Sequence, residues 1–325
     1  MKIRPSLIIL AIAASAFAGT VHAQSASGYP SKPIRIVVPF PPGGGADSIA
    51  RLFGPRIHER LGQQLIVDNR SGASTIIGGE LVAKAPADGH TLFMATFINA
   101  VNPSLRPKMP WDITKDFAPV ALLATVSYTL VVHPSLPARS VKELVALARS
   151  RPGQLDFGSA GNGTPGHLAG ELLNSIAKLD MVHVPYKGAA PVLIDVLAGQ
   201  VPITFGNNIA TLPHIKSGRL RALAVTSAQR SQLLPDSPTM IEGGLNDFLV
   251  VGWYGLLAPS GTPQPVVAKL SAELGAILRD PDVQKRLASG GSEAVGSTPA
   301  ELASFLRSEI AKWTKVVKSA GIRAD

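Results

Sequence analysis

Residues 34–67 read IRIVVPFPPGGGADSIARLFGPRIHERLGQQLIV, and this stretch decides the fold. The β-branched run 34–40 predicts a strand, the glycine-rich run 41–45 predicts a tight loop, and apolar residues recur at helical spacing over 47–61. Residues 65–67 predict a second strand. A strand, a glycine loop, a helix and a strand in this order form the building block of a parallel sheet.

The same order recurs about 120 residues later in the chain. Residues 155–157 and 181–184 predict strands, separated by the loop GSAGNGTPGH of residues 158–167 and a helix over 166–179. Two such units predict an α/β protein with two lobes of similar design. Further strands are predicted at 91–95, 119–124, 129–133, 203–205, 221–226 and 254–258, further helices at 140–149, 191–197, 265–278 and 299–320, and a connecting loop at 236–247.

The first 23 residues predict a secretory signal peptide. They contain a basic start with Lys2 and Arg4, an apolar run over 7–18, and a small-residue end at 21–23. No stretch reaches the roughly 18 uninterrupted apolar residues of a transmembrane helix. The chain has no cysteine, so it must fold without a disulfide or a lipid-modified cysteine. We therefore expect a periplasmic protein, exported with a cleaved signal peptide.

The charge of the chain does not predict nucleic-acid binding. The formal net charge is +9 and falls by two, to +7, when Lys2 and Arg4 leave with a segment that contains no acid. The basic residues are scattered along the chain, and only 5% of residues are aromatic, which is few for stacking on bases. We expect no nucleic-acid partner.

Both glycine loops end a predicted strand and begin a predicted helix. Backbone N–H groups at a helix N-terminus lack intrahelical partners, and the helix dipole adds partial positive charge, so an anion is stabilised there. Glycine allows the loop to turn sharply and a ligand to approach the backbone. One loop in each lobe would bind an anion from both sides. Glycines that only make tight turns are the alternative, and the residues alone leave both interpretations open.

A dinucleotide cofactor is the other ligand that this glycine pattern suggests. Gly161, Gly163 and Gly166 have the spacing G-x-G-x-x-G. A dinucleotide site also needs an acid about 20 residues on, at the end of the second strand, to bind the ribose. Here that strand is followed by residues 185–187, Pro-Tyr-Lys, and Asp180 comes before the strand. We therefore expect no cofactor.

Enzyme motifs are also missing from the sequence. It contains no G-x-S-x-G elbow, no Walker lysine and no H-E-x-x-H helix. His167 and Glu171 have i, i+4 spacing, but two groups do not make a metal site, so no metal is expected. Asp47 fits a helix-capping acid and a cleft residue equally well. An exported hydrolase that uses Ser159 or His167 is a remote alternative, because it lacks a base, an orienting acid and a nucleophile elbow.

Several stretches together carry a resemblance over essentially the whole mature chain. They are YPSKPIRIVVPFPPGGGADSIAR (29–51), VDNR (67–70), ADGHTL (87–92), DFAPV (116–120), GSAG (158–161), GHLAGE (166–171), HVPYKG (183–188), RALAVT (221–226), LPD (234–236) and WYGLLAP (253–259). On these residues the chain resembles the Bug-type extracytoplasmic solute receptors, the substrate-binding proteins associated with tripartite tricarboxylate transporters.

The resemblance implies a type II periplasmic-binding-protein fold. Two lobes with mainly parallel sheets, joined by crossing strands, would close on a ligand as a Venus flytrap, with lobe 1 at 24–128 and 252–325 and lobe 2 at 129–251. The second-lobe loop would hold a ligand carboxylate, and the first-lobe loop would close on it partly through ordered waters. The ligand-binding residues implied are Phe40, Pro42, Gly43, Gly44, Asp47, Ser159, Ala160, Gly161, Gly163, Thr164, His167 and Asn207.

Three segments bear on the identity of the ligand. Residues 71–75, Ser-Gly-Ala-Ser-Thr, place hydroxyls where the family usually has proline and glycines. At 205–208 the chain has Phe-Gly-Asn-Asn where many members carry an aspartate, which argues against the ammonium of an amino acid. Residues 97–99, Phe-Ile-Asn, leave room for an apolar or aromatic ligand body. The expected ligand is a small dicarboxylate, tricarboxylate or aromatic acid.

The function implied is that of a monomeric, non-enzymatic binding protein. It would capture the carboxylate and deliver it to inner-membrane transporter subunits. A sensor that presents the bound carboxylate to a membrane signalling kinase is the alternative.

Overall fold

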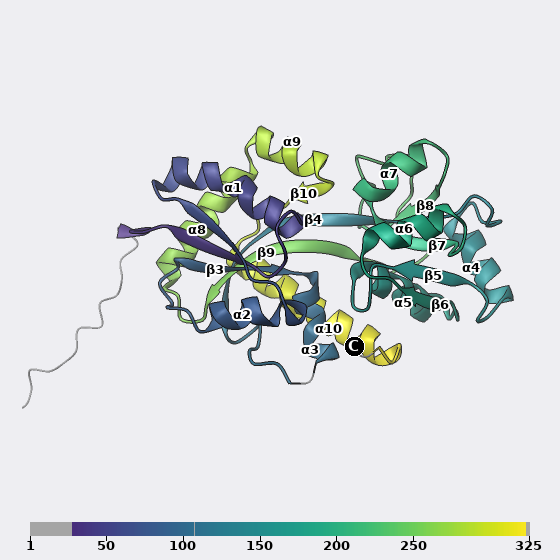
Figure 1. The fold of residues 1–325 in the computed structure, drawn as a ribbon, viewed down its shortest axis with the longest axis horizontal. Coiled ribbons are helices and arrows are strands. Elements are labelled where there is room, and N and C mark those ends of the chain that lie inside the picture. The colour runs from purple at the N-terminus through teal and green to yellow at the C-terminus, as the bar shows by residue number, and fades with distance from the viewer. Residues whose placement is uncertain (1–27, 107, 323–325) are drawn as a thin grey trace, which may run out of the picture.

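A computed structural model describes residues 28–106 and 108–322, which fold into two α/β lobes side by side (Figure 1). The two-lobe α/β architecture predicted from the sequence is confirmed. The predicted signal peptide, residues 1–23, lies outside the described residues. Across the described ranges, no helix has the length and apolar character needed to cross a membrane.

The first lobe contains the predicted strand, loop, helix and strand unit. Its sheet has the order β2-β1-β3-β9-β4, with β10 on the other side of β4. The β1–β2 and β1–β3 pairs are parallel, and the β3–β9, β9–β4 and β4–β10 pairs are antiparallel. The elements are β1 (Ile34–Val38), α1 (Gly45–Leu61), β2 (Leu65–Asn69), η2 (Ala73–Thr75), α2 (Ile76–Ala83), β3 (Thr91–Thr96), α3 (Phe97–Leu105), β9 (Val251–Pro259), α8 (Gln264–Leu278), α9 (Pro281–Ser289), β10 (Ser292–Ala294) and α10 (Pro299–Ser319).

The second lobe repeats this design. Strand β5 pairs in parallel with β6 and β7, whereas β7 and β8 pair antiparallel with β4. Each sheet is therefore mixed and not mainly parallel as expected, because the crossing strands pair antiparallel with their neighbours. The parallel part of each sheet lies on the side away from the crossing strands. The elements are α4 (Val141–Ser150), β5 (Asp156–Ser159), α5 (Pro165–Ala177), β6 (Val182–Pro185), α6 (Ala189–Leu197), β7 (Ile203–Asn207), α7 (Asn208–Lys216) and β8 (Arg221–Val225).

Strand β4 (Phe117–Val132) crosses from one lobe to the other. It pairs with β9 as far as Ser127 and with β7 from Tyr128 onward. The sequence predicted two strands here, at 119–124 and 129–133, and that break is wrong. The intervening residues 125–128, Thr-Val-Ser-Tyr, contain three residues that favour strands and no glycine or proline, so the strand continues through them.

Four helices were not predicted: α2, α3, α7 and α9. Helix α2 starts after Ala73, Ser74 and Thr75, whose φ angles of 44°, 52° and 79° are unusual outside glycine. Helices α3 and α7 contain Pro103 and Pro213, which the sequence pattern treats as breaks. The connecting loop at 236–247 contains neither helix nor strand, as predicted.

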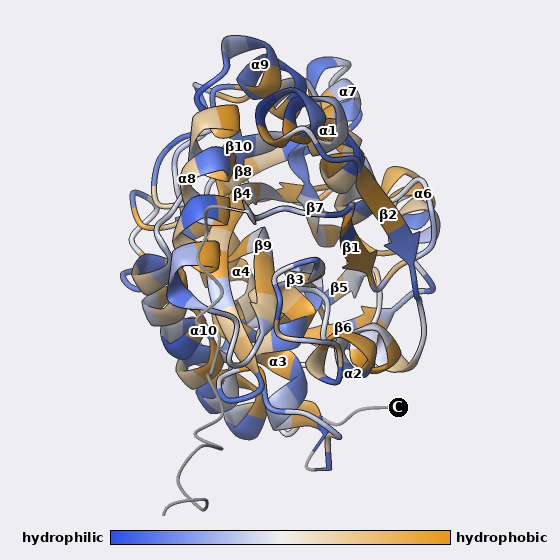
Figure 2. Ribbon diagram, turned by 90° about the vertical axis from the view of Figure 1, so that its left-hand side faces the viewer, coloured by the Kyte–Doolittle hydropathy of each residue, from blue (hydrophilic) through white to orange (hydrophobic). Residues whose placement is uncertain are grey.

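Helix α10 runs along one side of the molecule and contacts both lobes (Figure 1). It packs against α3 and β4 and also against α5 of the second lobe. Its start is fixed by a capping box between Thr298 and Glu301, and its Trp313 is fully buried. Apolar and polar segments alternate along α8 and α10 in Figure 2, as expected for helices that cover a core on one face.

Candidate functional site

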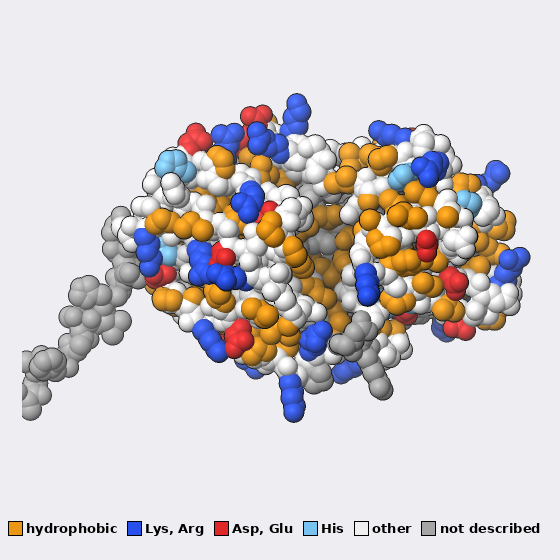
Figure 3. Space-filling model, in the orientation of Figure 1, with side chains coloured by type: hydrophobic (Ala, Val, Ile, Leu, Met, Phe, Trp, Pro, Cys, Tyr) orange, Lys and Arg blue, Asp and Glu red, His pale blue; other side chains and the backbone are white. Residues whose placement is uncertain are grey.

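The candidate site is a cavity of about 750 Å³ between the two lobes. Its walls come from the first glycine loop, from the starts of α2, α3 and α5, and from the crossing strands β4 and β9. Figure 3 shows the hollow between the lobes with hydrophobic side chains on its walls. The crossing strands contribute Val126, Tyr128, Gly252, Trp253 and Tyr254.

Four helices begin at this cavity. Helices α1, α2, α3 and α5 start immediately after N-cap residues that all line it, namely Gly44, Thr75, Thr96 and Thr164. Each N-terminus carries partial positive charge. No side chain caps the starts of α1 and α5. In α3, Thr96 accepts from the Asn99 N–H in a capping box, and in α2 the Ile76 N–H donates to the Ala73 carbonyl. The cavity therefore attracts an anion by dipoles from both lobes.

No charged side chain contributes to this attraction within the described residues. The lining contains no Asp, Glu, Lys, Arg or His. Its ionisable groups are the phenols of Tyr128 and Tyr254, and burial raises the pKa of each, so both keep their protons. A bound anion would therefore be held by backbone N–H groups and hydroxyls, without a salt bridge.

Six of the predicted ligand residues line this cavity: Phe40, Pro42, Gly43, Gly44, Gly163 and Thr164. A smaller hollow of about 160 Å³ adjoins it at Tyr128, Thr164 and Pro165, and is lined by the predicted Ala160 and Asn207. The remaining four are absent from both linings, and they are Asp47, Ser159, Gly161 and His167.

Asp47 holds the first loop in place from behind. Its buried carboxylate accepts from Gly43 N–H at 2.9 Å, from Arg51 Nε at 2.9 Å and from Asn69 Nδ2 at 3.0 Å. Asn69 also donates to the Phe40 carbonyl at 3.0 Å. The hydrogen bond from Arg51 outweighs burial and, with those from Gly43 and Asn69, lowers the pKa of Asp47 to about 2. Asp47 is thus a charged anchor for the loop.

The second loop is also braced by its own residues. Gly161 and Gly163 have φ angles of 130° and 73°, a region that favours glycine. Thr164 Oγ1 donates to the Gly161 carbonyl at 2.7 Å, which closes a tight turn before α5. A Cβ at Gly163 would lie 2.9 Å from Leu105 Cδ1, so the loop packs closely on α3 of the other lobe.

Several lining residues had no place among the predicted ligand residues. Ser74, Thr75, Phe97 and Ile98 line the cavity, and they fall in the two segments, 71–75 and 97–99, that the sequence had marked as bearing on the ligand. Tyr128 and Tyr254 carried no local signal. They face the cavity because β4 and β9 cross between the lobes there, which becomes evident only from the strand pairing.

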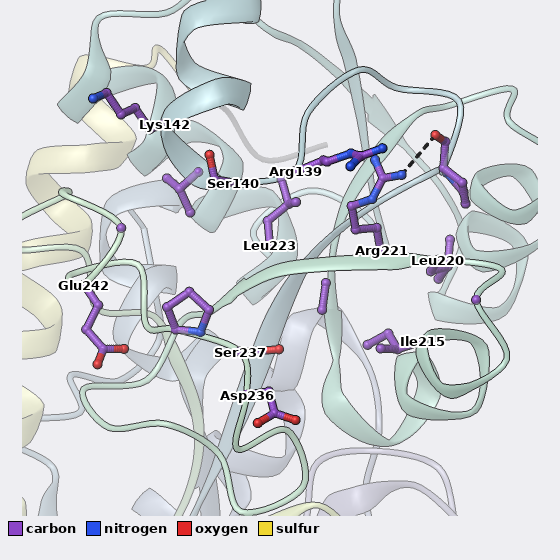
Figure 4. A pocket seen from close by; sticks show the side chains of 16 residues that line it. Arg139, Ser140, Lys142, Ile215, Leu220, Arg221, Leu223, Asp236, Ser237 and Glu242 are labelled. Carbon is purple, nitrogen blue, oxygen red and sulfur yellow. Dashed lines mark hydrogen bonds between the residues drawn. The ribbon is translucent and has the colours of Figure 1, made fainter.

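A larger hollow of about 850 Å³ lies on the second lobe, near the start of α4 (Figure 4). Charges of both signs line it, and Arg221 already donates to the carbonyls of Leu136 and Ala138. The N-terminus of α4 there is capped by its own Ser140, which accepts from Glu143 N–H. This groove offers neither a uniform charge nor an uncapped helix N-terminus, so the interlobe cavity is the better candidate.

A metal centre has no support in the described ranges, where no group of three or more His, Asp or Glu side chains is arranged to hold an ion.

Comparisons with known proteins find similarity along nearly the whole chain. Residues 49–322 match the family model described as the tripartite tricarboxylate transporter family receptor. The chain is similar to protein BugT of Bordetella pertussis, with 37% identity over 95% of this chain and 95% of that protein. It is similar to a solved Rhodopseudomonas palustris structure with adipate (39% identity, TM-score 0.77, 91% of this chain and 99% of that one). It is also similar to MatC of Rhodopseudomonas palustris with bound malate (33% identity, TM-score 0.73, 89% and 100% covered).

Proposed function

The chain belongs to the tripartite tricarboxylate transporter family of receptors, and from this membership we propose that it binds one small carboxylate between its lobes and delivers it to a membrane transporter. The membership confirms the resemblance drawn from the sequence motifs, and with it the periplasmic-binding-protein type of fold. The ligand classes proposed are dicarboxylates, tricarboxylates and aromatic acids.

The observation that carries this proposal is the convergence of four helix N-termini on an uncharged cavity. Such a site stabilises a negative group through N–H donors while leaving room for an apolar ligand body beside Val126, Phe97 and Trp253. Two similar proteins were solved with adipate and with malate, which are both carboxylates.

Binding is proposed to act by closure of the lobes about β4 and β9, with the lobes divided at residues 128/129 and 251/252. A ligand drives closure only if it contacts both lobes in the closed form. Helices α1 and α5 begin on opposite sides of the cavity and supply contacts from each lobe. The twelve ligand residues predicted from the resemblance divide accordingly into cavity-lining residues and residues that anchor the loops.

The remaining parts of the proposal concern location and chemistry. The chain is proposed to be exported with a cleaved signal peptide over residues 1–23 and to act in the periplasm as a monomer without enzymatic activity. The structure supplies the base that a hydrolase would need, because His183 Nε2 lies 2.6 Å from Ser159 Oγ. Ser159 is nevertheless 1% exposed, and no carboxylate bonds to His183 among the described residues, which argues against a nucleophile.

Thermal-shift measurements with matched carboxylate and amide pairs test this function. Adipate, malate, citrate and benzoate would be compared with adipamide, malamide, citramide and benzamide. At least one acid is expected to raise the melting temperature by mass action, and its amide is not, because the amide lacks the charge that the helix N-termini attract. Equal shifts by acid and amide, or no shift from any acid, would reject the proposal.

A variant that fills the cavity, compared with a matched surface variant, tests where the ligand binds. Val126→Trp places an indole inside the cavity from a rigid strand and is expected to abolish the shift. Val182→Trp, at a side chain 42% exposed outside the cavity, is expected to leave the shift unchanged.

A further inference from the structure

Two histidines stand behind the second-lobe loop, residues 159–164. His167 lies in the first turn of α5 and is 3% exposed, and His183 lies in β6. Their rings stack, with centroids 3.7 Å apart and planes 11° from parallel. Neither ring lines the interlobe cavity or the hollow that adjoins it, so a role for them must act through the loop.

Each ring reaches the loop through one nitrogen. Gly163 N–H donates to His167 Nδ1 at 3.0 Å, so this nitrogen is the acceptor. The other ring nitrogen, Nε2, lies 3.7 Å from Glu171 Oε1. His183 Nε2 is joined to Ser159 Oγ at 2.6 Å. The same Ser159 oxygen accepts from Gly161 N–H at 3.2 Å.

These bonds fix the directions of the peptide groups in the loop. They engage the N–H groups of Gly161 and Gly163, the two positions with positive φ, where the backbone has least intrinsic restraint. Thr164, the N-cap of α5, follows directly and lines the cavity. The course of the loop into α5, and with it the position of Thr164 at the cavity, therefore depends on His167 Nδ1 and on the Ser159 hydroxyl that His183 contacts.

We propose that His167 and His183 are positioning residues for carboxylate binding, and that each fixes the loop through a single ring nitrogen, Nδ1 of His167 on Gly163 N–H and Nε2 of His183 on the Ser159 hydroxyl. The inference rests on the proposed function of the interlobe cavity. The two stacked rings use different nitrogens, Nδ1 in His167 and Nε2 in His183. A general packing role would not require this difference.

Crossed amide substitutions test the assignment without any ligand. Asn places its side-chain oxygen near the position of Nδ1, whereas Gln reaches the position of Nε2. His167→Asn is therefore expected to retain the bond and His167→Gln to lose it, and the order reverses for His183→Gln and His183→Asn. Solvent exchange of the Gly163 amide, followed by NMR, is expected to be about tenfold faster in His167→Gln than in His167→Asn. The Gly161 amide reports in the same way on the His183 pair.

Adipate titrations by calorimetry supply the binding readout. The dissociation constant for adipate is expected to be about five- to tenfold higher in the variant that loses its bond than in its crossed partner. Equal exchange within both pairs, or affinities that follow melting temperature instead of the crossed pattern, would overturn the assignment. If wild-type protein does not bind adipate, that result bears on the proposed function, and the exchange rates alone decide. If one pair does not fold, the other pair decides.

Discussion

At the scale of single residues, the site is organised by groups that a ligand would never touch. Asp47 and His167 were among the ligand residues implied by the family resemblance, and the structure puts both behind the glycine loops. Each accepts a hydrogen bond from a loop N–H group. The loops therefore depend on a buried carboxylate in one lobe and on an imidazole in the other.

Replacing Asp47 by Asn should destabilise the first loop. The amide can no longer accept from both Gly43 N–H and Arg51 with the strength of a charged acceptor, so the free energy of unfolding is expected to fall by about 1–3 kcal/mol. Urea denaturation measures this change. Asp236→Asn, at an exposed carboxyl, is the control and should stay within about 0.5 kcal/mol of wild type. A wild-type midpoint for Asp47→Asn would contradict the anchoring role.

The His183 ring should make stability depend on pH. Burial first, and then the neighbouring His167, lower the pKa of His183 from 6.5 to about 4. Between these values the unfolded chain binds the proton and the folded chain does not, so stability should be full above pH 6.5 and decline as the pH falls toward 4. Denaturation at stepped pH should show a shallower decline for His183→Gln. Superimposable profiles for the two proteins would show that His183 is not the titrating group.

Sequence reasoning succeeded at the residue level where the signal is local. The two glycine loops are recognisable from their glycine content alone. The link between Ser159 and His183 does not, because the two residues are 24 apart and meet only through the parallel β5–β6 register, in which Phe157 lies opposite His183.

At the scale of elements, α5 shows how a helix is fitted to its strand. Gly170 lies on the buried face of α5, and a Cβ there would collide with the ring of Phe157 in β5. Gly275 in α8 is different, because a Cβ there would meet only Arg279 Nη1 at 3.6 Å. Helix propensity alone would predict that alanine stabilises both helices.

Alanine substitution at these two glycines should have opposite effects. Gly275→Ala is expected to raise the free energy of unfolding by up to about 1 kcal/mol. Gly170→Ala is expected to lower it by about 1–3 kcal/mol, because Phe157 must move in a packed core. Chemical denaturation of the two variants checks both signs. A stabilised Gly170→Ala would show that α5 does not pack on β5 as described.

Most elements with a clear period were predicted, including α1 in spite of its Pro55. Helix α9 was missed although Asp280 at its N-cap and Pro281 at its first position are local start signals. The parallel units, α8 and α10 follow from hydrophobic spacing. Helix α2 follows three residues with positive φ, and α3 and α7 contain proline, so their formation reflects tertiary packing that no local pattern carries. The continuity of β4 had a local basis in residues 125–128, but its partner strands come from both lobes and are not evident from sequence.

At the scale of the whole molecule, the two lobes are the halves of the proposed clamp. Gly163 in one lobe packs on Ile98 and Leu105 in the other, so the two halves meet beside the cavity. A carboxylate that contacts both lobes should favour closure of the lobes on it. Small-angle X-ray scattering should then give a smaller radius of gyration with a binding acid than with its amide. An unchanged radius at saturating acid would argue against hinged closure.

The most direct test of the central claim is a crystal structure of the chain with a carboxylate that passes the acid and amide comparison. We expect the carboxylate oxygens within hydrogen-bond distance of backbone N–H groups at the starts of α1 and α5, near Gly45 and Thr164, with no charged side chain in contact. A carboxylate bound instead to Arg139 or Lys142 in the groove near α4, or one that contacts only a single lobe, would contradict it.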